Sequence, residues 1–164
     1  MAEGRTHKVL KQVALRWVRQ TGCVAFVCEM SIGHIGIVDV AGIKTNGSVY
    51  IVEAKSSSAD MRSDMKDSRR NVSKIYRITH SNMVDFVYYI VADEVKIPDD
   101  FPDFIGILDQ NGRVRRNAKR RERIHNARVE LKDFNRFART ASWRAYGSVI
   151  NGEAEQREFS LMAT

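Results

Sequence analysis

The sequence has few cysteines and no long hydrophobic run. Its two cysteines, Cys23 and Cys28, lie five positions apart, and no second cysteine pair is present to complete a zinc site. We therefore expect buried, reduced thiols at these positions. The longest apolar stretches have the length of a β-strand, which is too short to cross a bilayer as a helix. The sequence thus predicts a protein without a membrane span.

Several functional motifs are also missing. The first residues lack the charged-then-apolar order of a signal peptide, so we expect a cytoplasmic protein. There is no zinc finger, no glycine-rich phosphate loop and no aromatic RNP-type motif for RNA recognition by base stacking. The 164 residues, 43% of them hydrophobic, suit one domain. We place this domain at residues 1–150, followed by a flexible polar tail at residues 151–164.

Positive charge dominates what is present. The net charge is +7 and the pI is near 9.6, which is typical of a protein with a polyanionic partner such as DNA. The basic residues do not line one face of a strongly amphipathic helix, which argues against a membrane surface as the partner. The densest basic stretch gives our predicted nucleic-acid-binding residues: Arg113, Arg115, Arg116, Lys119, Arg120, Arg121 and Arg123. The alternative interpretation of this stretch is a solvated loop without a specific role.

Hydrophobic periodicity predicts alternating helices and strands, and therefore an α/β domain. Apolar residues recur at helical spacing from residue 7 to residue 20, with basic residues between them. The pattern further predicts strands over 23–31, 35–43, 48–55, 86–92 and 105–108, and helices over 59–75 and 129–146. In the helix over 59–75 we expect aspartates to form ion pairs with nearby basic residues of the same helix. The order of the strands in the sheet does not follow from periodicity.

Two of these strands carry acidic residues within apolar runs. Asp39 lies in the strand over 35–43, and Glu53 lies two positions before Lys55 in the next strand. The turn between them contains Asn46-Gly47, the strongest short signal of a β-hairpin, which would bring the two carboxylates side by side. A buried carboxylate is costly unless it is paired or bound to a metal.

This arrangement suits metal-dependent hydrolysis of a phosphodiester. Carboxylates such as Asp39 and Glu53 are the ligands that Mg²⁺ prefers, together with waters and substrate phosphate oxygens. Glu53 and Lys55 point to the same face of a strand, so the lysine could orient the attacking water or stabilise charge on the phosphate. The alternative is a buried ion pair between Lys55 and one of the carboxylates, without a metal.

The pattern of Asp39 followed by Glu53-Ala54-Lys55 resembles the signature of the PD-(D/E)xK nuclease superfamily. Residues 53–66 are similar to the run that follows this signature in the MmcB family of DNA-repair proteins. Residues 101–109 and 137–139 also look like that family, so the resemblance covers most of residues 7–146. The chain departs from the family by lacking its Arg-Arg-Ala before the first Asp and its Trp-Pro-Asp-Tyr after the Lys.

The resemblance implies both a fold and an activity. The fold would be a restriction-endonuclease-like core with a mixed central β-sheet flanked by helices. The activity would be that of a Mg²⁺- or Mn²⁺-dependent DNA endonuclease in repair or recombination, with Asp39 and Glu53 as metal ligands and Lys55 as a catalytic residue. The family usually adds an upstream acidic residue, for which Glu29 is the candidate as catalytic residue and metal ligand.

The sequence is also compatible with a non-catalytic function and with a homodimer. A non-catalytic DNA-binding repair factor that keeps the nuclease fold is the alternative function, because positive charge supports it equally well. Superfamily members that act on branched DNA are often homodimers, but the sequence shows no clear interface stripe.

Overall fold

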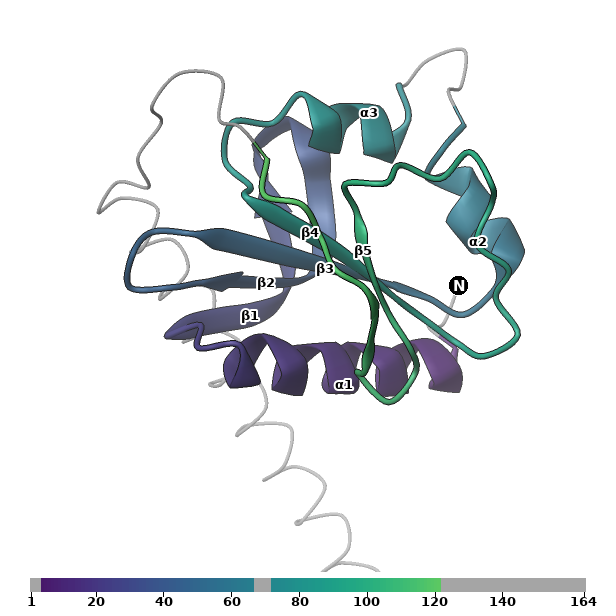
Figure 1. The fold of residues 1–164 in the computed structure, drawn as a ribbon, viewed down its shortest axis with the longest axis horizontal. Coiled ribbons are helices and arrows are strands. Elements are labelled where there is room, and N and C mark those ends of the chain that lie inside the picture. The colour runs from purple at the N-terminus through teal and green to yellow at the C-terminus, as the bar shows by residue number, and fades with distance from the viewer. Residues whose placement is uncertain (1–3, 67–71, 122–164) are drawn as a thin grey trace, which may run out of the picture.

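The computed structural model describes residues 4–66 and 72–121 (Figure 1). Their hydrophobic residues form one core around a six-stranded sheet with the strand order β1-β2-β3-β4-β5-β6. The elements in chain order are α1 (Arg5–Gln20), β1 (Ala25–Ile32), the 3-10 helix η1 (Gly33–Ile35), β2 (Gly36–Ile43), β3 (Val49–Lys55), α2 (Ser58–Ser63), α3 (Lys74–Thr79), β4 (Phe86–Val91), β5 (Gly106–Leu108) and β6 (Val114–Arg116).

The sheet is mixed, as expected. Strands β1, β2 and β3 form an antiparallel meander, β3, β4 and β5 run parallel, and β6 pairs antiparallel with β5. All seven residues of β3 are buried. A strand buried on both faces reads as a continuous apolar run, which explains why the charged residues of β3 stand out in the sequence.

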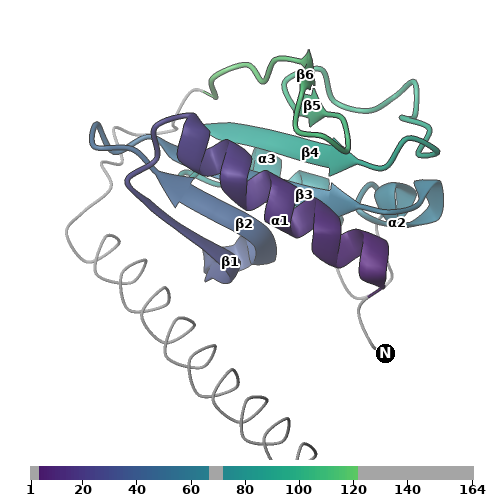
Figure 2. The same cartoon turned by 90° about the horizontal axis from the view of Figure 1, so that it is seen from below.

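Helices cover both faces of the sheet. Figures 1 and 2 show α1 lying across one face and α3 on the opposite face. Trp17 of α1 packs against Tyr88 of β4 at a ring-centroid distance of 4.5 Å and lies 6.5 Å from the ring of Tyr50. The apolar stripe of the predicted first helix is therefore core. Lys8, Arg16 and Arg19 are exposed, whereas Lys11 is buried. No helix in the described parts of the chain is long and apolar enough to cross a membrane.

The hairpin between β2 and β3 is confirmed. The amide of Gly47 donates to the carbonyl of Lys44 (2.9 Å), and the amide of Lys44 donates to the carbonyl of Ser48 (3.0 Å). Gly47 has a φ of 80°, a conformation that glycine adopts at little cost. The turn therefore forms at Asn46-Gly47 because it needs a residue with positive φ.

The single helix predicted over residues 59–75 is wrong. The structure has two short helices there, and each begins with its own serine cap: Ser57 accepts from the amide of Asp60, and Ser73 accepts from the amide of Tyr76. The amide of Ile75 donates to the carbonyl of Asp64 (3.0 Å), a bond that no continuous helix could make. The start of α3 thereby returns to the end of α2. The helix predicted over 129–146 and the tail over 151–164 lie outside the described residues.

Candidate active site

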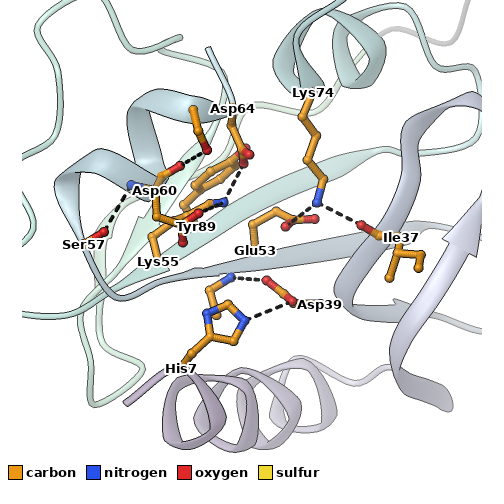
Figure 3. Close-up of polar contacts among 12 residues, drawn as sticks. His7, Ile37, Asp39, Glu53, Lys55, Ser57, Asp60, Asp64, Lys74 and Tyr89 are labelled. Carbon is orange, nitrogen blue, oxygen red and sulfur yellow. Dashed lines mark hydrogen bonds and ion pairs between the residues drawn. The ribbon is translucent and has the colours of Figure 1, made fainter. Parts of the chain in front are cut away.

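The candidate site lies where β2 and β3 separate. Their ladder runs from the pair Ile43 and Val49 to the pair Val40 and Val52. Beyond it, the Oδ2 atom of Asp39 accepts a hydrogen bond from the amide of Ala54 (2.8 Å). The side chain of Asp39 thus takes the place of a ladder bond and lies next to the strand segment that carries Glu53 (Figure 3).

Glu53 is the most deeply buried acidic residue of the site. Its side chain is 2% exposed; Oε2 accepts from Nζ of Lys74 (2.6 Å), whereas the buried Oε1 atom has no hydrogen-bond partner among the described residues. Burial raises the pKa of Glu53 to about 8, because the nearby ammonium of Lys74 offsets only part of the desolvation and the carboxylate of Asp39 adds repulsion. A second cation close to Oε1 would relieve this penalty.

Lys55 projects from the end of β3 toward α2. Its Nζ atom lies 2.9 Å from Oδ2 of Asp64 and 3.4 Å from Oδ1 of Asp60. Burial lowers the pKa of Lys55, but the ion pair and hydrogen bond with Asp64, together with the charges of Glu53 and Asp60, raise it by more, so the net pKa lies above the ordinary lysine value. Lys55 is therefore a fixed positive charge at neutral pH, suited to stabilising an anion and unsuited to accepting a proton.

Asp64 and Tyr89 complete a buried network that sequence reasoning missed. The hydroxyl of Tyr89 on β4 donates to Oδ2 of Asp64 (2.8 Å), and burial raises the pKa of this tyrosine well above its ordinary value, with Asp64 adding to the shift. We expected the aspartates of this segment to pair within one helix. Asp60 and Asp64 instead contact Lys55, because the chain folds back beside the end of β3.

Lys74 and His7 are the other missed members of the site. Figure 3 shows Glu53 between Lys55 on one side and Lys74 on the other, with His7 beside Asp39. The Nε2 atom of His7 lies 3.3 Å from Oδ1 of Asp39. Lys74 lies 21 positions after Glu53, and no local pattern links the two. The sequence also contains no pattern that predicts the contact of His7 with Asp39.

Glu29 lies beside the site on β1, and its carboxylate forms an ion pair with a lysine of α1. Its carboxylate contacts Nζ of Lys11 on α1 at 2.7 Å, and its backbone has a φ of 53°. In the register of β1 and β2, Glu29 falls opposite Asp39, between the pairs Cys28–Val40 and Met30–Val38. Glu29 and Asp39 are therefore neighbours across the two strands, but the carboxylate of Glu29 contacts Lys11.

The site offers few protein ligands for a divalent cation. Within the described residues, no three His, Cys, Asp or Glu side chains form a group that could hold a metal ion. Mg²⁺, however, often uses only one or two protein carboxylates and completes its shell with water and phosphate oxygens. Asp39 and Glu53 supply two carboxylates, and Oε1 of Glu53 is buried without a hydrogen-bond partner. The residues fit a two-carboxylate site for such an ion.

The basic residues of the predicted DNA-binding stretch have different contacts in the fold. Arg116 donates to the carbonyls of Ile105 and Pro102 (both 2.9 Å), and Arg121 donates to the carbonyls of Val84 and Thr79. These two arginines therefore hold loops together, unlike the side chains of a free loop. Burial also lowers the pKa of Arg121.

The remaining basic side chains of this stretch differ in position. Arg115 lies 3.2 Å from Asp93, Lys119 forms an ion pair with Asp103, and Arg120 lies 3.9 Å from Asp85. Arg113 is exposed at the turn before β6, whereas Arg123 lies outside the described residues.

The position of Arg113 and Arg115 relative to the site follows from the strand register. Lys55 pairs with Val91 at the ends of β3 and β4, and Leu108 at the end of β5 pairs with Val114 of β6. Arg113 and Arg115 flank Val114 and so lie at the same end of the sheet as Lys55. Three strand spacings of about 4.8 Å put β6 roughly 14 Å from β3.

Comparisons with known proteins support the fold and leave the activity open. No protein-family model matches the chain, and no curated protein matches it. A solved structure of a protein of unknown function from Silicibacter pomeroyi is similar, with a TM-score of 0.63 and 20% sequence identity over 88% of this chain and 91% of that chain. The likeness supports the α/β fold with its mixed sheet.

Proposed function

We propose that the protein is a Mg²⁺- or Mn²⁺-dependent deoxyribonuclease with a restriction-endonuclease-like fold, acting in DNA repair or recombination in the cytoplasm. One observation carries the proposal. Asp39 and Glu53 meet where β2 and β3 separate, beside the buried ammonium of Lys55, and a buried oxygen of Glu53 has no hydrogen-bond partner among the described residues. Two carboxylates and a fixed cation are what hydrolysis of a phosphodiester requires.

In the proposed reaction, a water oxygen bonds to phosphorus and gives up a proton, the phosphodiester P–O bond breaks, and the leaving oxygen takes up a proton. Asp39 and Glu53 would hold a divalent ion, which would polarise the phosphoryl group of the substrate and lower the pKa of the attacking water. Lys55 keeps its proton because of Asp64, so its role is to stabilise the negative charge that develops on the phosphate.

Charge and position support DNA as the substrate. The net charge of +7 favours a polyanion. Arg113 and Arg115 share an end of the sheet with Lys55, so a phosphate backbone that crosses the site can reach both. We therefore retain these two as DNA-contacting residues.

The test is incubation of the purified chain with labelled duplex, single-stranded, flap and four-way-junction DNA in Mg²⁺ or Mn²⁺. We expect cleavage that Glu53→Ala and Lys55→Ala abolish and that chelation prevents. Arg16→Ala is the matched control, because Arg16 is exposed on α1 and takes no part in the site. Cleavage that persists in both site variants would contradict the proposal.

A non-catalytic DNA-binding repair factor is the second candidate, and a specific observation favours it. Lys74 already contacts Glu53, and Asp64 already contacts Lys55, so the chain supplies opposite charges to two of the three motif residues. This candidate predicts salt-sensitive DNA binding that is unchanged in Lys55→Ala, with no cleavage and no divalent-ion binding.

A further inference from the structure

The contacts of Lys74 are those of a bound cation. Its Nζ atom lies 2.6 Å from Oε2 of Glu53 and 2.9 Å from the carbonyl oxygen of Ile37. The side chain is 16% exposed, so these oxygens replace much of the water around the ammonium. A carboxylate oxygen and a carbonyl oxygen are also the kind of ligands that hard divalent cations take.

The fold fixes Lys74 in this position. Lys74 is the first residue of α3, directly after the serine that caps this helix. The next residue, Ile75, is buried and donates its amide to the carbonyl of Asp64. Both residues of the contact are thus held in place. Glu53 is part of the fully buried strand β3, and Lys74 is held by the hydrogen bond between Ile75 of α3 and Asp64 at the end of α2.

The other oxygen of Glu53 gives the second, independent observation. Oε1 is buried and accepts no hydrogen bond from the described residues, and the Glu53 side chain is only 2% exposed. One ammonium therefore satisfies only half of this carboxylate. A divalent ion at Oε1 would stand next to the ammonium on the same carboxylate, and the two positive charges would repel each other in a site with little water to screen them.

We propose that Lys74 is a built-in cation on Oε2 of Glu53, and that a divalent ion that binds at Oε1 displaces its ammonium. This inference rests on the proposed function and adds how the site is regulated. In the absence of metal, the ammonium then offsets part of the cost of burying Glu53. The cost is a lower affinity for the ion, because binding must break the contacts of Lys74 with Glu53 and Ile37.

The first test measures Mn²⁺ affinity by titration calorimetry, without DNA. We expect Lys74→Met to bind Mn²⁺ roughly tenfold more tightly than the unaltered chain, because the competing charge is gone. Lys66→Met removes the same charge from an exposed position of the same segment and should leave the affinity within about twofold. Circular dichroism establishes that each variant is folded.

The second test follows the ammonium itself in the unaltered chain. In metal-free buffer, the Nζ protons of Lys74 should give an NMR signal protected from exchange with water, assigned by its loss in Lys74→Arg. Addition of Mg²⁺ should remove the protected signal as the ammonium moves into solvent. This measurement does not depend on the folding of Lys74→Met and does not require DNA cleavage.

The outcomes separate this inference from the proposed function. Ion binding with equal affinities in the unaltered chain and Lys74→Met, or a protected Lys74 signal at saturating Mg²⁺, overturns the displacement of Lys74 and leaves the nuclease proposal standing. Absence of ion binding in both the unaltered chain and Lys74→Met overturns the two together. Tighter binding by Lys74→Met together with loss of the Lys74 signal supports displacement.

Discussion

At the scale of single residues, the site is a chain of opposite charges. Lys74, Glu53, Lys55 and Asp64 alternate in sign across a small buried volume. A charge that is removed from water is tolerated only with a partner, so the loss of one member leaves its neighbour buried without compensation. The same alternation makes the members sensitive to pH and to metal.

Glu53 should make the protein less stable as pH rises. Its pKa of about 8 in the folded chain lies above the unperturbed value of 4.5, so the folded state keeps a proton that the unfolded state has lost. The stabilisation is fully present below pH 4.5 and is lost as pH rises toward 8, by about 1 kcal/mol per pH unit. Urea unfolding in EDTA at pH 5, 6, 7 and 8 measures this slope.

Substitution isolates the contribution of Glu53 from that of other titrating groups. Glu53→Gln should flatten the pH dependence, whereas Glu94→Gln, at an exposed position, should leave it unchanged. An equal slope in Glu53→Gln and the unaltered chain would show that Glu53 is not the group responsible.

Asp64 is expected to be worth more to stability than a surface acid. Asp64→Asn leaves the buried ammonium of Lys55 without its nearest carboxylate, and should cost about 3 kcal/mol in the free energy of unfolding. Tyr89→Phe removes only a hydrogen bond to Asp64 and should cost about 1 kcal/mol. Chemical denaturation of these variants, and of Lys55→Met, Asp64→Leu and the double variant Lys55→Met/Asp64→Leu, measures the coupling. Additive losses in the double variant would contradict a direct interaction.

At the scale of elements, the sequence predicts correctly those features that depend on neighbouring residues in the chain. The Asn46-Gly47 turn and the apolar strands follow from backbone preference and burial, which short segments carry in their own sequence. The predicted helix over 59–75 failed for a non-local reason. Asp60 and Asp64 form ion pairs with Lys55 of β3 and not with basic residues of their own helix. The spacing of these residues in the sequence does not predict that contact.

The contact between α1 and β2 depends on a glycine. A Cβ atom at Gly42 would lie 2.3 Å from Cγ1 of Val18 and 3.0 Å from Sγ of Cys23, so Gly42→Ala must push the helix away from the sheet. We expect a loss of about 2 kcal/mol in the free energy of unfolding. Gly4→Ala is the control, since nothing lies within 4 Å of the added atom. A loss at Gly42 no larger than at Gly4 would disprove close packing.

At the scale of the whole molecule, the fold places the basic residues of the predicted DNA-binding stretch at two different ends of the sheet. Arg113 and Arg115 lie at the end of the sheet that holds Lys55, whereas the amide of Lys119 bonds to the carbonyl of Phe104, before β5 begins. Positive charge that is continuous in the sequence is therefore distributed over two ends of the fold.

This separation predicts unequal effects on DNA binding. Arg113→Ala and Arg115→Ala should each weaken binding and lower the slope of log affinity against log salt by about 0.9, the loss of one phosphate contact. Lys119→Ala removes the same charge at the other end and should change the slope little. Fluorescence anisotropy over a range of salt concentrations, with metal chelated, gives the slopes. Equal effects of all three substitutions would indicate that net charge alone matters.

The α/β class, the hairpin and the neighbouring positions of Asp39 and Glu53 follow from the sequence alone, because they depend on periodicity and on one turn. Which charges meet depends on the tertiary fold. Lys74 of α3 contacts Glu53 of β3, His7 of α1 contacts Asp39 of β2, and Glu29 contacts Lys11. Such contacts join residues far apart in the chain, and they form only when the folding of the core brings their elements together.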